Sequence, residues 1–144
     1  IVLLKAVDTN KFLPIWIGHA EAAAILMKLQ GTDTPRPMTH DLVTQIMGEL
    51  NAHVAKITVT ELRDNTFYAL ITLKAETSEI DVDSRPSDAI ALAVRANAPI
   101  FAADQVIEDS GIEFPDQPVE TEDVVAQFKE FLENVTPEDF AGES

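Results

Sequence analysis

Two stretches in the middle of the chain place an apolar residue at every second position. Ala55, Ile57 and Val59 alternate with polar neighbours, and residues 67–73 repeat the same alternation. A period of two is typical of half-buried strands, and the charged and amide residues at 63–65 form a turn signal between them. The pattern therefore predicts an antiparallel hairpin with one apolar face.

Two further stretches, residues 1–6 and 11–17, are apolar at nearly every position. Strands of this composition are buried on both faces, either in a core or at a subunit contact. The polar residues 8–10 signal a turn, so the two stretches are expected to form a second hairpin. Pro14 cannot donate to a strand ladder, which places it at a sheet edge or a bulge. Shorter strands are predicted at residues 79–83 and 100–101.

Apolar residues three and four positions apart predict helices elsewhere, bounded by glycine, proline or polar capping residues. The predicted helices cover residues 19–30, 39–50, 88–96, 103–110 and 121–134. Hairpins combined with helices indicate an α+β fold. We expect a mixed, largely antiparallel sheet built from hairpins, with helices packed on it and an acidic helix at the C-terminal end.

Charge divides the chain in two. The net charge is −15, of which residues 1–112 carry −6 and residues 113–144 carry −9. Lys129 is the only basic residue of the second part. We therefore expect a domain over residues 1–112, followed by an acidic linker and helix suited to docking on a protein partner. A surface of this sign repels nucleic acid, whose binding normally needs clustered Lys and Arg.

Composition excludes several classes of protein. Without cysteine, the chain can form neither disulfides nor thiolate metal sites. Its five glycines are too far apart to build a phosphate-cradling loop. No apolar run is long enough to span a membrane and no secretory signal is present, so a cytoplasmic location is expected. The chain starts at Ile1 inside a predicted strand, so its true start is expected to be missing.

Two short segments share an unusual order of residues. Residues 35–41 and 83–88 each contain Arg-Pro, then a hydroxyl residue, then an acid, and each leads into a predicted helix. Proline suits the first helical turn, and Thr39 and Ser87 are suited to cap the exposed N–H groups there. Each segment is expected to hold a guanidinium close to a carboxylate at a helix N-terminus, an end that often binds anions. If the two segments meet in the fold, they form one compact polar site.

The residue types in these segments suit hydrolysis of a phosphodiester. Carboxylates such as Asp83 and Asp88 are hard oxygen ligands that suit Mg²⁺ or Mn²⁺, and a bound ion of this kind can activate water. His40 can move a proton. Arg36 or Arg85 can bind phosphate with a planar fork.

A structural interpretation fits the same residues. Aspartate at a helix start complements the helix dipole, and Arg85 with Asp88 can form an ion pair that ties a loop to a helix. Glu21 is either a surface residue of the first helix or a residue that faces the site. Trp16 is expected in the core rather than as a platform for nucleotide stacking.

Five motifs along the chain resemble those of the bifunctional nuclease domain family. They agree with the family in sequence and in spacing, and they lie at residues 13–22, 35–42, 66–69, 83–93 and 98–100. The resemblance implies an oligomeric α+β domain, and it implies cleavage of DNA and RNA, an activity associated with plant members. The polar residues that match the family motifs are Glu21, Arg36, His40, Asp41, Arg85, Ser87 and Asp88.

The leading hypothesis is a nuclease that hydrolyses DNA and RNA with Mg²⁺ or Mn²⁺. Its catalytic residues would be Glu21, His40, Asp41 and Asp88. Its substrate-binding residues would be Arg36, Arg85 and Ser87. Its metal ligands would be Asp41, Asp83 and Asp88.

Two other hypotheses come from different classes of protein. One is a non-enzymatic, oligomeric binding or regulatory module, whose polar site captures an anionic ligand or a protein partner. The other is a structural homo-oligomer, because strands that are apolar on both faces are costly to expose in a monomer.

Overall fold

A computed structural model of the chain describes residues 1–113. The predicted linker and acidic helix therefore lie outside the described residues, and the division after residue 112 stays a prediction. Within the described part, no helix is long and apolar enough to cross a membrane.

The N-terminal hairpin forms as the apolar pattern predicts. Strand β1 (Val2–Lys5) pairs antiparallel with β2 (Lys11–Ile15). A strand that the pattern did not predict, β7 (Ile112–Glu113), pairs with the first two residues of β2 and completes a small sheet of order β1-β2-β7. The pairing of β7 with β2 ends at Phe12, so no described strand pairs with that edge of β2 at Pro14. A free strand edge is a position where proline is tolerated, because it needs no N–H donor.

The larger sheet is built on the predicted central hairpin. Strands β3 (His53–Arg63) and β4 (Thr66–Lys74) are antiparallel, and the residues between them, Asp64 and Asn65, have φ angles of 50° and 66°. Positive φ at both central residues is the geometry of the tight hairpin turn that Asn and Asp tolerate.

Two short strands extend this sheet at its edges. Strand β5 (Glu79–Ser84) lies outside β4, and β6 (Ile100–Ala102) runs parallel to β3, which gives the order β5-β4-β3-β6. The register places Val82 opposite Ile71 of β4, on the apolar face of the sheet. Even so, Ile80 and Val82 are 51% and 40% exposed. The apolar face of the sheet is therefore left partly uncovered at its outer strand, β5.

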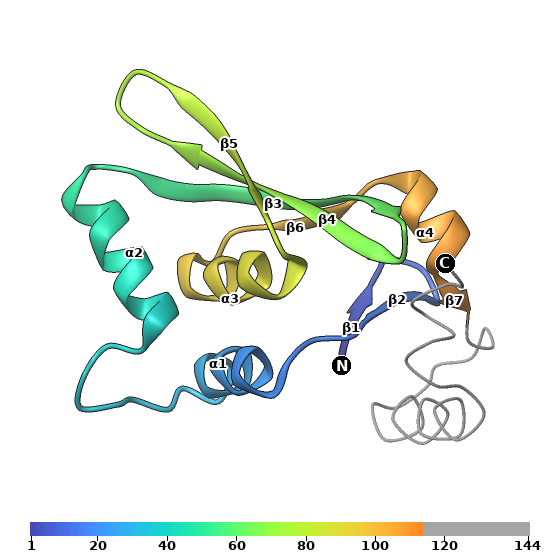
Figure 1. The fold of residues 1–144 in the computed structure, drawn as a ribbon, viewed down its shortest axis with the longest axis horizontal. Helices are drawn as coiled ribbons and strands as arrows, with labels where there is room; N and C mark the ends of the chain where they lie inside the picture. The colour runs from blue at the N-terminus through green and yellow to red at the C-terminus, as the bar shows by residue number, and fades with distance from the viewer. Residues whose placement is uncertain (114–144) are drawn as a thin grey trace.

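Four helices accompany the sheets within the described residues: α1 (His19–Leu29), α2 (Thr39–Glu49), α3 (Pro86–Ala96) and α4 (Asp104–Ser110). Figure 1 shows α3 lying against β3 and β4, with α1 packed on α3, and α2 packed on α3 and on one end of β3. Helix α3 can take this central place because it is apolar nearly all round, with every residue from Ala89 to Ala93 buried. The α+β prediction is confirmed.

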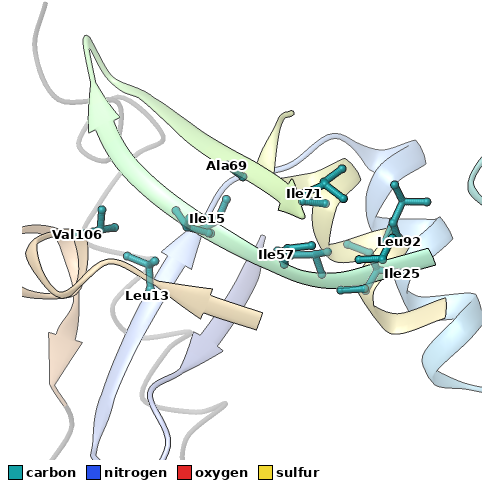
Figure 2. Packing of buried hydrophobic residues seen from close by; sticks show 14 residues of the cluster. Leu13, Ile15, Ile25, Ile57, Ala69, Ile71, Leu92 and Val106 are labelled. Carbon is teal, nitrogen blue, oxygen red and sulfur yellow. The ribbon is translucent and has the colours of Figure 1, made fainter. Parts of the chain in front are cut away.

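One contiguous core joins both sheets and the helices. Figure 2 shows Leu13 and Val106 at one end of the buried cluster and Ile25 and Leu92 at the other, with Ile57 of β3 between them. Strand β2 is buried from Phe12 to Ile15 by elements of its own chain. The apolar faces of β2 therefore do not require a second subunit, whereas β1 is only half-buried, and the expectation of a homo-oligomer stays a prediction.

Candidate functional site

The two segments of similar sequence meet where helices α2 and α3 begin. His40, in the first turn of α2, and Asp88, in the first turn of α3, lie 48 positions apart in the sequence, and their Nε2 and Oδ1 atoms are 2.9 Å apart. Partial burial alone would raise the pKa of Asp88, but hydrogen bonds from His40 and Arg85 outweigh it and hold the pKa below its ordinary value. Asp88 is therefore the charged acceptor, and His40 donates from Nε2.

Arg85 extends this pair toward helix α1. Its Nε donates to the second oxygen of Asp88 at 2.9 Å, and its terminal nitrogen also lies 3.1 Å from the carboxylate of Glu21. The hydrogen bond to Asp88 raises the pKa of Arg85. Glu21 thus faces the site, one of the two predicted alternatives. The side chain of Arg85 remains 66% exposed, so a ligand can still reach it.

The helix starts are capped differently from the prediction. The N-cap residues are Met38 and Arg85, which makes Thr39 the first residue of α2 and Ser87 a buried residue in the first turn of α3. At α2 the backbone N–H of Met38 donates to Asp41 Oδ2 at 3.0 Å. The carboxylate of Asp41, three residues further on, therefore accepts a hydrogen bond from an N–H group that has no partner within the helix. The predicted cap at Thr39 is wrong; at α3, where the sequence predicts Ser87 or a near neighbour, the N-cap is Arg85.

A second ion pair joins the same helices. Arg95 Nε donates to Asp41 Oδ1 at 2.7 Å, and its terminal nitrogens donate to the carbonyl oxygens of Ala91 and of Ala24 in α1. The hydrogen bond from Arg95 lowers the pKa of Asp41. Sequence reasoning missed Arg95, although Asp88, Ala91 and Arg95 follow the i, i+3, i+7 spacing of one helix face.

Arg95 takes the place that the sequence suggested for Arg36. Asp41 was expected to have Arg36 of its own segment as a neighbour, but its guanidinium partner comes from α3 instead. Arg36 is exposed, and within residues 1–113 no ion pair of its side chain is found. Its predicted role in binding substrate stays a prediction.

The three predicted metal ligands do not come together. Asp41 contacts Arg95, Asp88 contacts His40 and Arg85, and Asp83 lies exposed on β5. Across the described residues, no group of three or more His, Asp or Glu side chains is arranged to hold a metal ion. The predicted set of Asp41, Asp83 and Asp88 therefore does not form one metal site in the described residues, and the need for Mg²⁺ or Mn²⁺ stays a prediction.

The fold and the site together define an α+β domain whose histidine, carboxylate and arginine side chains meet at two helix starts. The family model that describes the bifunctional nuclease domain matches residues 2–115, so the chain belongs to that family. This finding confirms the family suggested by the five sequence motifs.

Two relatives illustrate the range of similarity. The chain is 38% identical over 146 residues to Uncharacterized protein MT1877 of Mycobacterium tuberculosis, a match that covers 97% of this chain and 87% of that protein. It is 26% identical over 129 residues to Bifunctional nuclease 1 of Oryza sativa subsp. indica, which covers 87% of this chain but 39% of the rice protein.

Proposed function

We propose that this domain is a nuclease that hydrolyses phosphodiester bonds in both DNA and RNA. The observation that carries the proposal is the contact between His40 and Asp88, which joins two distant family motifs, with Arg85 on the same carboxylate. A proton-transfer group, an orienting carboxylate and an exposed guanidinium are the groups that phosphodiester hydrolysis needs close together.

In this proposal, Arg85 binds a non-bridging phosphate oxygen and His40 moves the proton. Asp88 fixes the imidazole by accepting from Nε2, which leaves Nδ1 as the nitrogen able to take up a proton. DNA lacks the 2′-hydroxyl, so a nuclease for both substrates cannot depend on attack by that group, and in this proposal the nucleophile is water. The water oxygen bonds to phosphorus while its proton passes to His40, the bond from phosphorus to the leaving sugar oxygen breaks, and that oxygen takes a proton from solvent.

The proposal is tested by cleavage of plasmid DNA and of a single-stranded RNA. His40→Gln and Asp88→Asn should each lower the rate by roughly 100-fold or more, because general acid–base catalysis contributes about 10²–10⁴. Glu108→Gln is the matched control, since this carboxylate is exposed on α4 and outside the contacts described above. Equal cleavage by wild type and both site variants would exclude the mechanism. Repeating the assay with EDTA tests the predicted dependence on Mg²⁺ or Mn²⁺.

One observation favours a second candidate, a non-enzymatic module that binds a protein partner rather than a phosphate. Arg85 is already paired with both Glu21 and Asp88, so a phosphate must compete with two carboxylates for one guanidinium. If the cluster serves only to lock α1 and α2 to α3, the His40 and Asp88 variants will melt at lower temperature while the wild type cleaves nothing. The predicted protein partner of the acidic extension and the cytoplasmic location stay predictions under either candidate.

A further inference from the structure

A pocket lies beside the guanidinium of Arg85, on the side away from helix α2. It has a volume of about 350 Å³ and is formed by the end of β2, the residues leading into α1, the β3–β4 turn and the start of α3. This size lies in the range of small-ligand sites in proteins. Arg85 lines the pocket and also contacts Glu21 and Asp88, so it connects the pocket to the candidate site.

Aromatic side chains form part of the pocket wall. Trp16 lines it and is 38% exposed, which corrects the prediction that this residue is buried in the core. Phe67, at the start of β4, lines it as well and packs on the core behind. A partly exposed indole at a pocket can offer a face on which a flat aromatic ligand stacks.

The polar groups of the pocket suit an anionic ligand that also carries a hydrogen-bonding ring. Arg85 is the only charged residue among the described residues that line the pocket, in a chain whose net charge is −15. Asn65 and Thr66 add an amide and a hydroxyl from the hairpin turn. The pocket thus offers one cation, donors and acceptors, and apolar rings. The carboxylates of Glu21 and Asp88 pair with that cation from outside the lining residues, so an anionic ligand has to displace them from Arg85.

We propose that this pocket is a stacking site for an unpaired nucleobase, next to the phosphate that Arg85 binds, so that the preferred substrate is a single strand. The inference rests on the proposed function and names the substrate class of the same site. Every base has a flat face, so stacking accepts DNA and RNA alike without selecting sequence. A paired base stacks inside its duplex and cannot enter the pocket without being extruded, which costs energy.

The chain contains one tryptophan, so its fluorescence reports on this pocket directly. The probes are oligo(dT), oligo(U), an abasic strand of the same length and a hairpin duplex, each titrated into the His40→Gln variant to prevent cleavage. Both single strands should quench Trp16 and saturate, whereas the abasic strand and the duplex should leave the emission nearly unchanged. Quenching by only one of the two single strands restricts the site to that sugar type.

Affinity measured by anisotropy of labelled oligo(dT) separates stacking from backbone attraction. Trp16→Ala should weaken binding by about 10-fold, because stacking on an aromatic side chain contributes about 1–3 kcal/mol per base. Trp16→Phe should recover most of that loss. The matched control is Phe101→Ala, since Phe101 is another exposed aromatic residue, on β6, and does not line this pocket.

The results separate this inference from the proposed function. If oligo(dT) binds equally well to wild type and to Trp16→Ala without a change in emission, the stacking site is excluded, while cleavage lost in His40→Gln still supports the nuclease. If single strands quench Trp16 but no strand is ever cleaved, the stacking site stands and the nuclease proposal fails.

Discussion

Replacing Arg95 with methionine should unfold the helical layer at a measurably lower temperature. The side chain of Arg95 is 6% exposed and links three helices, through Asp41 of α2, Ala24 of α1 and its own helix α3. Methionine has a similar length and keeps the apolar contacts of the arginine stem. The variant therefore removes the charge and the hydrogen bonds with little change in packing.

The size of the effect follows from what the substitution leaves behind. A hydrogen bond that involves a charged group contributes about 1.5–3 kcal/mol, and both the bond to Asp41 and the bond to the Ala24 carbonyl are donated by the charged guanidinium. Asp41 is 35% exposed and can regain water, which keeps the loss below that of a fully buried charge. We expect a loss of about 2–3 kcal/mol, or about 8–12 °C in Tm for a domain of this length.

The difference between wild type and variant should depend on pH with a definite sign. Arg95 lowers the pKa of Asp41 below its ordinary value of 3.8. A group whose pKa is depressed by folding contributes its full stability above the unfolded pKa and loses it as the pH falls through the folded pKa. The difference in Tm between wild type and Arg95→Met should therefore be largest at neutral pH. It should become smaller as the pH falls below 3.8, the ordinary pKa of an aspartate.

Thermal unfolding followed by circular dichroism across this pH range tests both expectations. The control is Arg63→Met, because Arg63 is exposed, so its ion pair with Glu61, at 3.8 Å, and its cation–π contact with Tyr68, at 4.5 Å, should each contribute no more than about 1 kcal/mol. A gap in Tm for Arg95→Met no larger than that of the control, or a gap that does not narrow in acid, would refute the reasoning.

Three further predictions follow from other parts of the structure. A Cβ at Gly18 would collide with the carboxylate of Glu21, so Gly18→Ala should displace that carboxylate from Arg85. In a double-mutant cycle, the effect of Gly18→Ala on the cleavage rate should therefore not add to the effect of Glu21→Gln. Additive losses of rate would contradict the prediction. Asn65→Val should destabilise the protein to urea by about 1–2 kcal/mol, since a β-branched residue is strained at its φ of 66°, and an Asn65→Gly variant that is equally destabilised would count against strain. The predicted self-association is best sought at the exposed apolar face of α2, where Ile46 is 51% exposed; light scattering should give a multiple of 15.8 kDa for wild type and a single chain for Ile46→Glu, and a wild-type monomer would end that prediction.

Elements with a strong local signal could be predicted from the sequence. The alternation of residues 67–73 and the turn at Asp64 and Asn65 depend on neighbouring positions, and both appear in the β3–β4 hairpin as expected. Strand β7 has two residues and exists only because β2 offers an edge about a hundred positions earlier in the sequence. A pattern of neighbouring residues does not show which distant strand a short segment will pair with.

The same distinction explains the candidate site. The repeated order of Arg-Pro, hydroxyl residue and acid pointed to His40, Arg85 and Asp88, because helix starts have a local sequence signature. The partner of Asp41 could not be found locally, since Arg95 lies near the other end of α3 and reaches Asp41 only through the packing of two helices. The prediction that Trp16 is buried failed for a related reason. The apolar sequence of a strand does not show which of its residues other elements will bury.

The pairing of β7 with Lys11 and Phe12 also bears on how the protein is made. During synthesis, the first hairpin emerges from the ribosome long before the residues that complete its sheet. The small sheet cannot close until Glu113 is available, so early folding intermediates will present an open strand edge to chaperones or to neighbouring nascent chains.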